Sequence, residues 1–182
     1  MRLFALIGFL AVCAAIAAAV FFFGGFYNVA ASNDNPPAVD WVLIHVRQAS
    51  IAKHADATPP GNLNDTTFIQ SGARAFAQRG CTSCHGGPGV AWEKFADGLN
   101  PGPPDLKDVV PELKPEELFW VVKNGIGMTG MPSFGAAGLN DQEIWSLVAF
   151  LRKLPIISEA DYKNWTASAA APPAAAPAGA TP

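Results

Sequence analysis

Cysteine and histidine are scarce in this chain of 182 residues, which contains only three of each. Cys81 and Cys84 form one pair, while Cys13 stands alone inside an apolar run. A structural zinc site needs four ligands, usually with a second cysteine pair or a histidine pair at finger spacing. The chain has no second cysteine pair, and His45 and His54 do not have that spacing. The composition therefore argues against a structural zinc site.

Basic residues are few as well. Twelve Lys and Arg stand against fifteen Asp and Glu, for a net charge of −3, and between residues 62 and 165 the counts are nine and twelve. Proteins that bind nucleic acids neutralise phosphates with an excess of basic residues, which this chain lacks. We expect no nucleic-acid partner, and the mild acidity favours partner proteins whose docking faces are neutral or basic.

The cysteine pair stands in the sequence Cys81-Thr82-Ser83-Cys84-His85. Two cysteines at this spacing, with a histidine directly after the second, are typical of a site for covalent haem attachment. Each thiol adds to one vinyl group of the same porphyrin, so both sulfurs must lie on one short turn, and His85 can then offer a nitrogen to the iron. A redox dithiol would lie in a βαβ pattern, which is missing. A disulfide between Cys81 and Cys84 is the remaining alternative.

A second candidate ligand lies in the glycine-rich segment 125–135, which contains Met128 and Met131. A thioether sulfur on the iron raises the reduction potential, because it favours the softer ferrous state. Met131 precedes Pro132, which holds it in an extended conformation and stiffens the loop around it. We therefore predict Met131 as the sixth iron ligand. Met128 is the alternative, and its other possible role is hydrophobic filler.

A long uncharged run opens the chain. Residues 3–23 carry no charge and would extend about 32 Å as a helix, enough to cross a bilayer. The run could continue through Tyr27, whose ring suits a membrane interface. It is longer than the roughly 7–15 apolar residues of a signal peptide, although residues 29–31 could pass for a small-residue cleavage site. We predict an uncleaved signal anchor in residues 1–31, with residues 3–27 as the contact with the membrane.

The charges on either side of this run predict its orientation. Arg2 precedes it, whereas Asp34 and Asp40 follow it. Basic residues favour the cytoplasmic side, so we predict a single-pass cell-membrane protein whose haem domain lies on the periplasmic side. Export suits the cysteine motif, because thioether bonds to haem would keep Cys81 and Cys84 from pairing in an oxidising compartment.

The segment 32–61 is predicted to be a linker that contains an amphipathic helix at 39–54. Two rows of side chains recur there at helical spacing: Trp41, Ile44, Gln48 and Ile51, and Val42, Val46 and Ala49. The pattern leaves three arrangements open for this helix: on the membrane, docked to a partner subunit, or packed against the haem domain. His45 and His54 are predicted to be solvated rather than iron ligands, because Pro59-Pro60-Gly61 separates them from the haem motif.

Residues 62–165 are predicted to form the haem domain, beginning with a helix that ends at Gly80. Thr67 to Gln70 fits a capping box at its start. Phe68, Gly72 and Phe76 share one helical face, and a glycine on such a face indicates that another backbone passes close by.

After the motif, residues 86–110 are rich in Gly and Pro and predict a long loop that wraps around the haem. Trp92 and Phe95 are candidate haem contacts in this loop.

Two more helices and a tail complete the pattern. The first starts at Pro115 and stops at Asn124-Gly125. Asn140 caps the second, which carries a stripe of Ile144, Leu147, Val148 and Leu151 and ends before Pro155. Residues 166–182 are Ala/Pro low complexity and are predicted to be disordered.

With CTSCH, a later GMPSFG loop and a closing amphipathic helix in that order, residues 62–155 resemble the class I cytochrome c family. The resemblance implies an all-α fold around one haem c with an exposed edge. It assigns the thioether bonds to Cys81 and Cys84, the proximal iron ligand to His85 and the distal iron ligand to Met131.

The resemblance also implies two structural contacts. Gly72 and Phe76 of the first helix would cross the last helix at Leu147 and Phe150. A proline carbonyl after the motif would accept a hydrogen bond from the proximal imidazole, and Pro88 is the candidate.

These features predict a membrane-anchored monohaem electron carrier in a periplasmic respiratory chain rather than an enzyme, so no residue is assigned as catalytic. The donor and acceptor would be other redox proteins. One alternative is a haem c subunit fixed within a larger dehydrogenase or oxidase complex. Another is a haem-based sensor with an open distal site, although no distal acid–base group is evident. A single CxxCH motif excludes a dihaem peroxidase in one chain.

Overall fold

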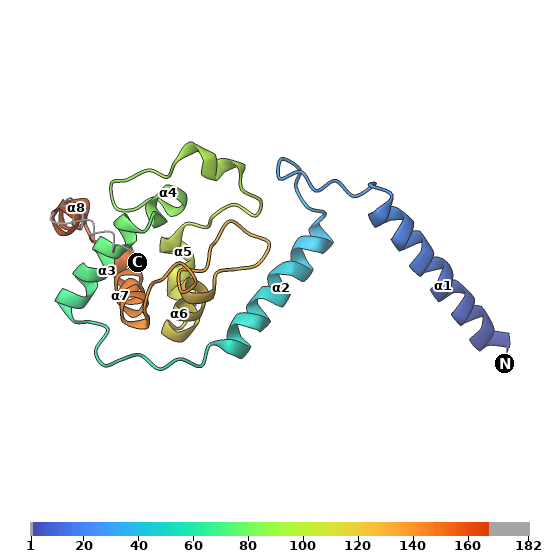
Figure 1. Ribbon diagram of the computed structural model, residues 1–182, viewed down its shortest axis with the longest axis horizontal. Coiled ribbons are helices and arrows are strands. Elements are labelled where there is room, and N and C mark those ends of the chain that lie inside the picture. Colours follow the sequence, from blue (N-terminus) through green and yellow to red (C-terminus); the bar gives the residue numbers. More distant parts are fainter. Residues whose placement is uncertain (1, 168–182) are drawn as a thin grey trace, which may run out of the picture. The chain divides into compact units, whose positions relative to one another are not determined.

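A computed structural model describes residues 2–167. The described chain forms two compact units, one ending at Asn35 and the other starting at Pro36. Its regular elements are α-helices and short 3-10 helices, and residues 2–167 contain no β-strand (Figure 1). The predicted all-α class is therefore confirmed. Residues 168–182 of the predicted Ala/Pro tail lie outside the described residues.

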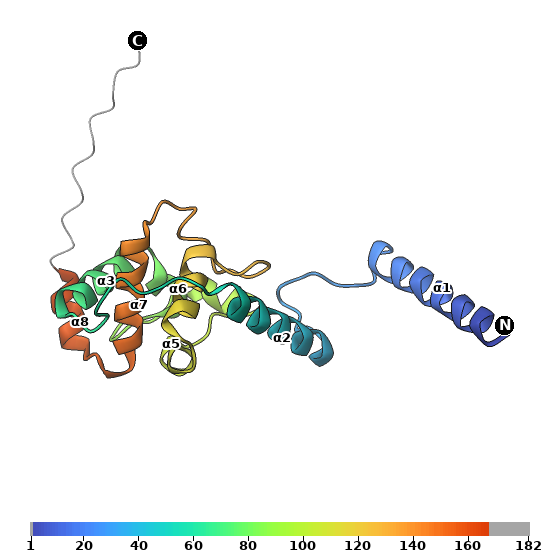
Figure 2. The same cartoon turned by 90° about the horizontal axis from the view of Figure 1, so that it is seen from below.

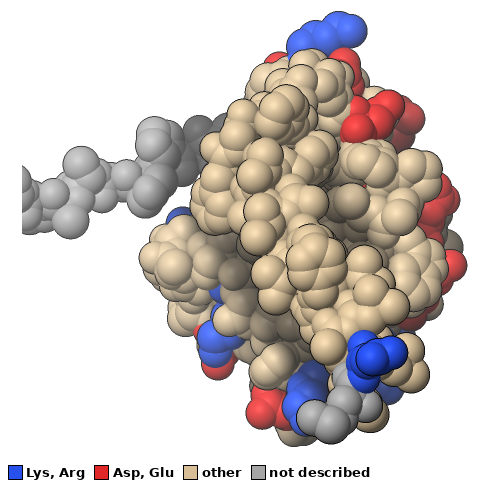
Figure 3. Space-filling model, turned by 90° about the vertical axis from the view of Figure 1, so that its right-hand side faces the viewer, with Lys and Arg blue, Asp and Glu red and all other residues tan. Residues whose placement is uncertain are grey.

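The first unit is dominated by α1 (Arg2–Phe23), whose 22 residues are all exposed. α1 is long and apolar enough to cross a bilayer, which is compatible with single-pass membrane anchoring. It ends at Gly24-Gly25, where Gly25 has a φ of +77°. The space-filling view from this end shows mostly uncharged side chains, with most charged ones toward the margin (Figure 3).

The second unit opens with α2 (Pro37–His54), which packs against α6 (Pro115–Asn124). Ile51 of α2 is 7% exposed, and the ring of His54 stacks on Trp120 of α6 at 6.1 Å between centroids. Of the three arrangements that the sequence left open for this helix, packing on the predicted haem domain is thus observed along one side.

The core of the second unit is the crossing of α3 (Thr66–Gln78) and α7 (Asp141–Lys153), which lie side by side in both views (Figures 1 and 2). A Cβ placed on Gly72 would lie 1.9 Å from the carbonyl oxygen of Ser146, so no other residue fits there without moving a helix. The rings of Phe76 and Phe150 meet at 5.2 Å. The predicted close approach at Gly72 is confirmed, with Ser146 as the nearest backbone neighbour.

The helix starts differ in how well the sequence predicted them. The cap of α7 is as predicted: the Asn140 side chain accepts from the backbone N–H of Glu143, and the Glu143 carboxylate accepts from that of Asn140. The capping box predicted at Thr67 is wrong. α3 begins at Thr66, and its cap is Asp65, two residues before Thr67, which accepts from the backbone N–H of Phe68 at 2.9 Å.

Short elements surround this core. They are α4 (Cys81–His85), η1 (Lys94–Gly98), α5 (Leu106–Val109), η2 (Val110–Glu112), η3 (Leu154–Ile156) and α8 (Glu159–Ala167). The predicted loop at 86–110 therefore contains two short helical pieces. α6 packs on α7 by stacking Phe119 against Trp145 at 4.3 Å. The sequence analysis did not predict α8, which packs beside α3 and buries Tyr162.

Candidate functional site

The CTSCH motif forms the short helix α4, which is bounded by two glycines. Gly80 has a φ of +79° and Gly86 a φ of +64°, a left-handed region that favours glycine at both ends of the helix. Cys81 and Cys84 are one helical turn apart, so their sulfurs leave the same side of α4. Both are free thiols, and the alternative of a disulfide between them is not formed. His85 is the last residue of the helix.

Burial controls the protonation of these side chains. Burial raises the pKa of the Cys81 thiol to about 12, which favours the protonated thiol at neutral pH. Burial also lowers the pKa of His85, although its hydrogen bond to Pro104 acts in the opposite direction. A lowered pKa favours the neutral imidazole, which is the form that binds a metal.

One hydrogen bond fixes the orientation of His85. Its Nδ1 lies 3.1 Å from the carbonyl oxygen of Pro104. Since a carbonyl can only accept, Nδ1 carries the proton and Nε2 keeps its lone pair for a ligand. The sequence analysis expected such a carbonyl from Pro88, and that assignment is wrong. The partner lies nineteen residues beyond His85, in the proline-rich segment that precedes α5.

The methionine segment is held in a tight loop after α6. Gly125, with a φ of +69°, ends α6, and a Cβ there would lie 2.6 Å from the carbonyl carbon of Pro132. The backbone N–H of Ile126 donates to the carbonyl of Met131 at 3.1 Å, and the Thr129 hydroxyl donates to the Ile126 carbonyl at 2.7 Å. These bonds close the loop on itself.

The two methionines differ in burial. Met131 is half-buried and packs against the core cluster, whereas Met128 is 88% exposed and has a φ of +60°. Hydrophobic filler, the other role considered for Met128, does not suit so exposed a side chain. The geometry therefore favours Met131 as the inward-facing sulfur.

The loop that carries Pro104 lies against the loop that carries Met131. A Cβ on Gly130 would lie 2.8 Å from Cδ1 of Leu99, so the two loops are in close contact at this point. Cys81 and Met131 also pack against the same hydrophobic core cluster. The predicted attachment turn, its histidine and the favoured methionine thus belong to one connected region of the second unit.

Other sequence candidates lie elsewhere or are exposed. His45 and His54 both lie on α2, which carries neither CTSCH nor the methionine loop, and the Nδ1 of each bonds to a carbonyl of the same helix, at 2.7 and 2.8 Å. Trp92 and Phe95 are 55% and 60% exposed, and Trp92 donates its indole N–H to Asp97 at 2.9 Å.

Tyr162 is a residue near the motif that the sequence analysis missed. It is 3% exposed and its hydroxyl has no hydrogen-bond partner. Burial, and secondarily Cys81, raises the pKa of this phenol to about 12. Its ring stacks on Phe150 at 5.7 Å and lies against Gly87. The only signal in the sequence for the helix that carries Tyr162 was Ser158, a residue type that favours helix starts. Its side chain accepts from the backbone N–H of Asp161 at the start of α8.

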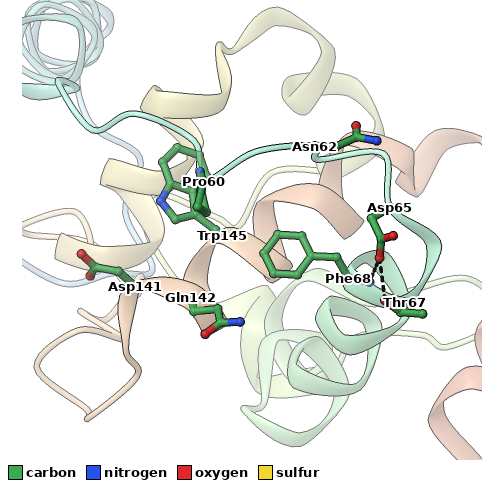
Figure 4. A pocket seen from close by; sticks show the side chains of 8 residues that line it. All are labelled: Pro60, Asn62, Asp65, Thr67, Phe68, Asp141, Gln142 and Trp145. Carbon is green, nitrogen blue, oxygen red and sulfur yellow. Dashed lines mark hydrogen bonds between the residues drawn. The ribbon is translucent and has the colours of Figure 1, made fainter.

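A separate open depression of about 530 Å³ lies where the start of α7 faces the chain around Asp65 (Figure 4). Its lining residues are Pro60, Asn62, Asp65, Thr67, Phe68, Asp141, Gln142 and Trp145. None of them belongs to α4 or to the methionine loop, so this depression is not part of the candidate site.

The donor set fits a metal that arrives inside a porphyrin. Residues 2–167 contain no cluster of three or more His, Cys, Asp and Glu side chains that could hold a bare metal ion. A c-type haem needs less from the protein, namely two thiols on one turn, one oriented neutral imidazole and one further axial donor. α4 and the methionine loop offer these groups.

Comparison with known proteins gives one match. Residues 68–151 match the family model of cytochrome c oxidase, cbb3-type, subunit III, which describes a class I monohaem c-type cytochrome domain. No curated protein and no solved structure matches the chain.

Proposed function

Since residues 68–151 form a class I c-type cytochrome domain, which implies haem-based electron transfer, we propose that the chain is a membrane-anchored electron carrier. It would pass single electrons between redox proteins of a periplasmic respiratory chain. α1 serves as the anchor, and the haem domain lies on the periplasmic side. The chain would perform no bond chemistry on a substrate, because its own side chains, His85 and Met131, would hold the iron.

Four residues hold the cofactor in this proposal. Cys81 and Cys84 would form the two thioether bonds, and His85 and Met131 would bind the iron. Haem c bound in this way supplies a one-electron couple at neutral pH. The observation that carries the assignment is the hydrogen bond from Nδ1 of His85 to the Pro104 carbonyl at 3.1 Å. It sets the tautomer, fixes the ring and leaves Nε2 for the iron.

The loop around Met131 supports its role in a second way. Met131 lies in a short loop that is closed by the Ile126–Met131 and Thr129–Ile126 hydrogen bonds, neither of which involves the Met131 sulfur. A preorganised thioether favours ferrous iron and raises the reduction potential. The proposal therefore predicts a potential above that of a bis-histidine haem.

The first test is the optical spectrum of the detergent-solubilised, oxidised protein. We expect the weak far-red band of sulfur-to-iron charge transfer in the wild-type protein. Met131→Ala should lose this band, and Met128→Ala, the matched control in the same loop, should keep it. A wild-type protein without the band contradicts the assignment of the distal ligand. Rapid binding of CO to the reduced wild-type protein would then favour the sensor alternative.

The second candidate function is a haem c subunit fixed within a larger oxidase complex. The matching family, subunit III of cbb3-type oxidases, favours it. Purification in mild detergent separates the two candidates. Recovery of a free monomer supports the carrier, whereas co-purification with other subunits in fixed proportion supports the complex.

A further inference from the structure

α2 has two opposite faces, and only one of them is covered. Its inner face follows the spacing i, i+4, i+7, i+11 and i+14, which places side chains on one side of a helix. The inner face consists of Asp40, Ile44, Arg47, Ile51 and His54. Asp40 and Arg47 are half-buried, Ile51 is buried, and His54 stacks on Trp120. This is the side that packs against α6.

The outer face lies opposite and is apolar. It consists of Val42, Val46, Ala49 and Lys53, with Trp41 beside it. Trp41 is 62%, Val42 49% and Val46 60% exposed, and Lys53 is the only charged side chain, at the far end of the face. An apolar helix face is normally covered by another apolar surface. The second side of α2 therefore calls for an apolar surface outside the described domain.

We propose that the outer face of α2 lies on the lipid bilayer in which α1 is anchored. The inference rests on the membrane anchor of the proposed function. Thirteen residues, 24–36, separate α1 from α2, and even fully extended they reach only about 45 Å. The bilayer is therefore always within reach of α2, at an effective concentration that no freely diffusing partner matches.

The chemistry of the outer face suits an interface rather than a protein groove. The small apolar side chains of Val42, Val46 and Ala49 can insert at the boundary between the lipid headgroups and the acyl chains. Trp41 can place its ring at the level of the headgroups. Lys53 can extend its ammonium toward lipid phosphates. Because the inner face of α2 is packed on α6, membrane contact would hold the haem domain at the surface in one orientation. Encounters with redox partners in the same membrane would then be confined to two dimensions.

The test places a fluorophore on each of two sites in the full-length holoprotein, reconstituted into phosphatidylcholine nanodiscs at one copy per disc. An NBD label at Val46→Cys reports on the outer face. The control label is at Lys94→Cys on η1, whose side chain is fully exposed. Both variants carry Cys13→Ser, and haem occupies Cys81 and Cys84. A labelling ratio above one per chain would show that haem is not attached, a failure of the proposed function that is distinguishable from failure of this inference.

We expect the Val46 label to emit at shorter wavelength and to lose intensity with nitroxide-labelled acyl chains, while the Lys94 label does neither. Adding Val42→Asp should return the Val46 label to a water-like emission without changing the haem spectrum. A water-like, unquenched Val46 label in the parent protein would overturn the proposal. A blue-shifted label that lipid nitroxides do not quench would also overturn it, because a protein surface would then cover the face.

Discussion

Two parts of the haem domain are held in different ways. At the crossing of α3 and α7, backbone touches backbone beside Gly72, and the rings of Phe76 and Phe150 are 2% and 0% exposed. The loops beside α4 and after α6 instead depend on single hydrogen bonds and on glycines with positive φ. The crossing is stabilised by packing that any change of volume disturbs. The loops are stabilised by conformational constraints that place His85 and Met131, the two proposed iron ligands.

The largest effect should come from filling the crossing. Gly72→Val would place side-chain atoms inside the backbone of α7 and force the helices apart. We expect a loss of more than about 3 kcal/mol in the free energy of unfolding, measured by chemical denaturation of the holoprotein.

The matched control is Gly98→Ala, because a Cβ at Gly98 meets nothing within 4 Å. It should change the free energy of unfolding by less than about 1 kcal/mol. Equal losses in both variants would mean that the crossing is no tighter than the loops, and the contrast between the two regions would fail.

A smaller loss should follow from straining the methionine loop. Gly125→Ala forces a Cβ on a residue with a φ of +69°, 2.6 Å from the carbonyl carbon of Pro132. We expect a loss of about 2 kcal/mol in the free energy of unfolding, together with a weaker far-red band, because the loop that positions Met131 must shift.

Gly127→Ala is the control in the same loop, since a Cβ at Gly127 meets no atom within 4 Å. It should leave both the stability and the band near wild type. If Gly125→Ala lowers the stability but leaves the band intact, the loop does not position the iron ligand in the way proposed.

The start of α7 offers a third, weaker test, on the crossing side of the comparison. Asn140→Ala removes the side chain that accepts from the backbone N–H of Glu143 at 3.0 Å. The loss of a helix cap costs about 1 kcal/mol of stability. Asn140→Asp keeps an acceptor and should stay close to wild type by the same denaturation assay. If Asn140→Ala leaves the free energy of unfolding unchanged, packing alone fixes the start of α7.

Much of the crossing could be read from the sequence because its determinants are local. The face with Gly72 and Phe76 and the cap at Asn140 follow from spacing and residue type alone. The cap of α3 was misplaced because Asp65 and Thr67 both suit a helix start, and sequence does not rank two such neighbours. Indeed, the Thr67 hydroxyl donates to the Asp65 carboxylate, so the two residues act together.

The loops were harder to predict because their contacts depend on the path of the chain. The type of interaction at His85 was foreseen, but the partner, Pro104, lies nineteen residues away and not at the nearest proline. α8 was missed because it is short and has no clear apolar periodicity, with only Tyr162 buried. For α2 both rows of side chains were seen, but only the structure shows which row meets α6.

Tyr162 joins the two regions, since its ring stacks on Phe150 of the crossing and its edge lies against Gly87 after the haem motif. Its buried hydroxyl has no hydrogen-bond partner. Tyr162→Phe should therefore raise the free energy of unfolding at pH 7 by up to about 1 kcal/mol, because it removes an unsatisfied polar group. This is the smallest predicted change in the free energy of unfolding, and the only predicted increase.

The pH dependence of stability gives the same substitution a second readout. The pKa of Tyr162 is raised from 10.0 to about 12 in the folded protein, so the folded state holds this proton more tightly than the unfolded state. The resulting stability is fully present below pH 10 and is lost as the pH rises from 10 to 12. The difference in stability between Tyr162→Phe and wild type should therefore grow over that window. If Tyr162→Phe instead destabilises the protein at pH 7, the hydroxyl has a partner, and the haem motif and the crossing are coupled through it.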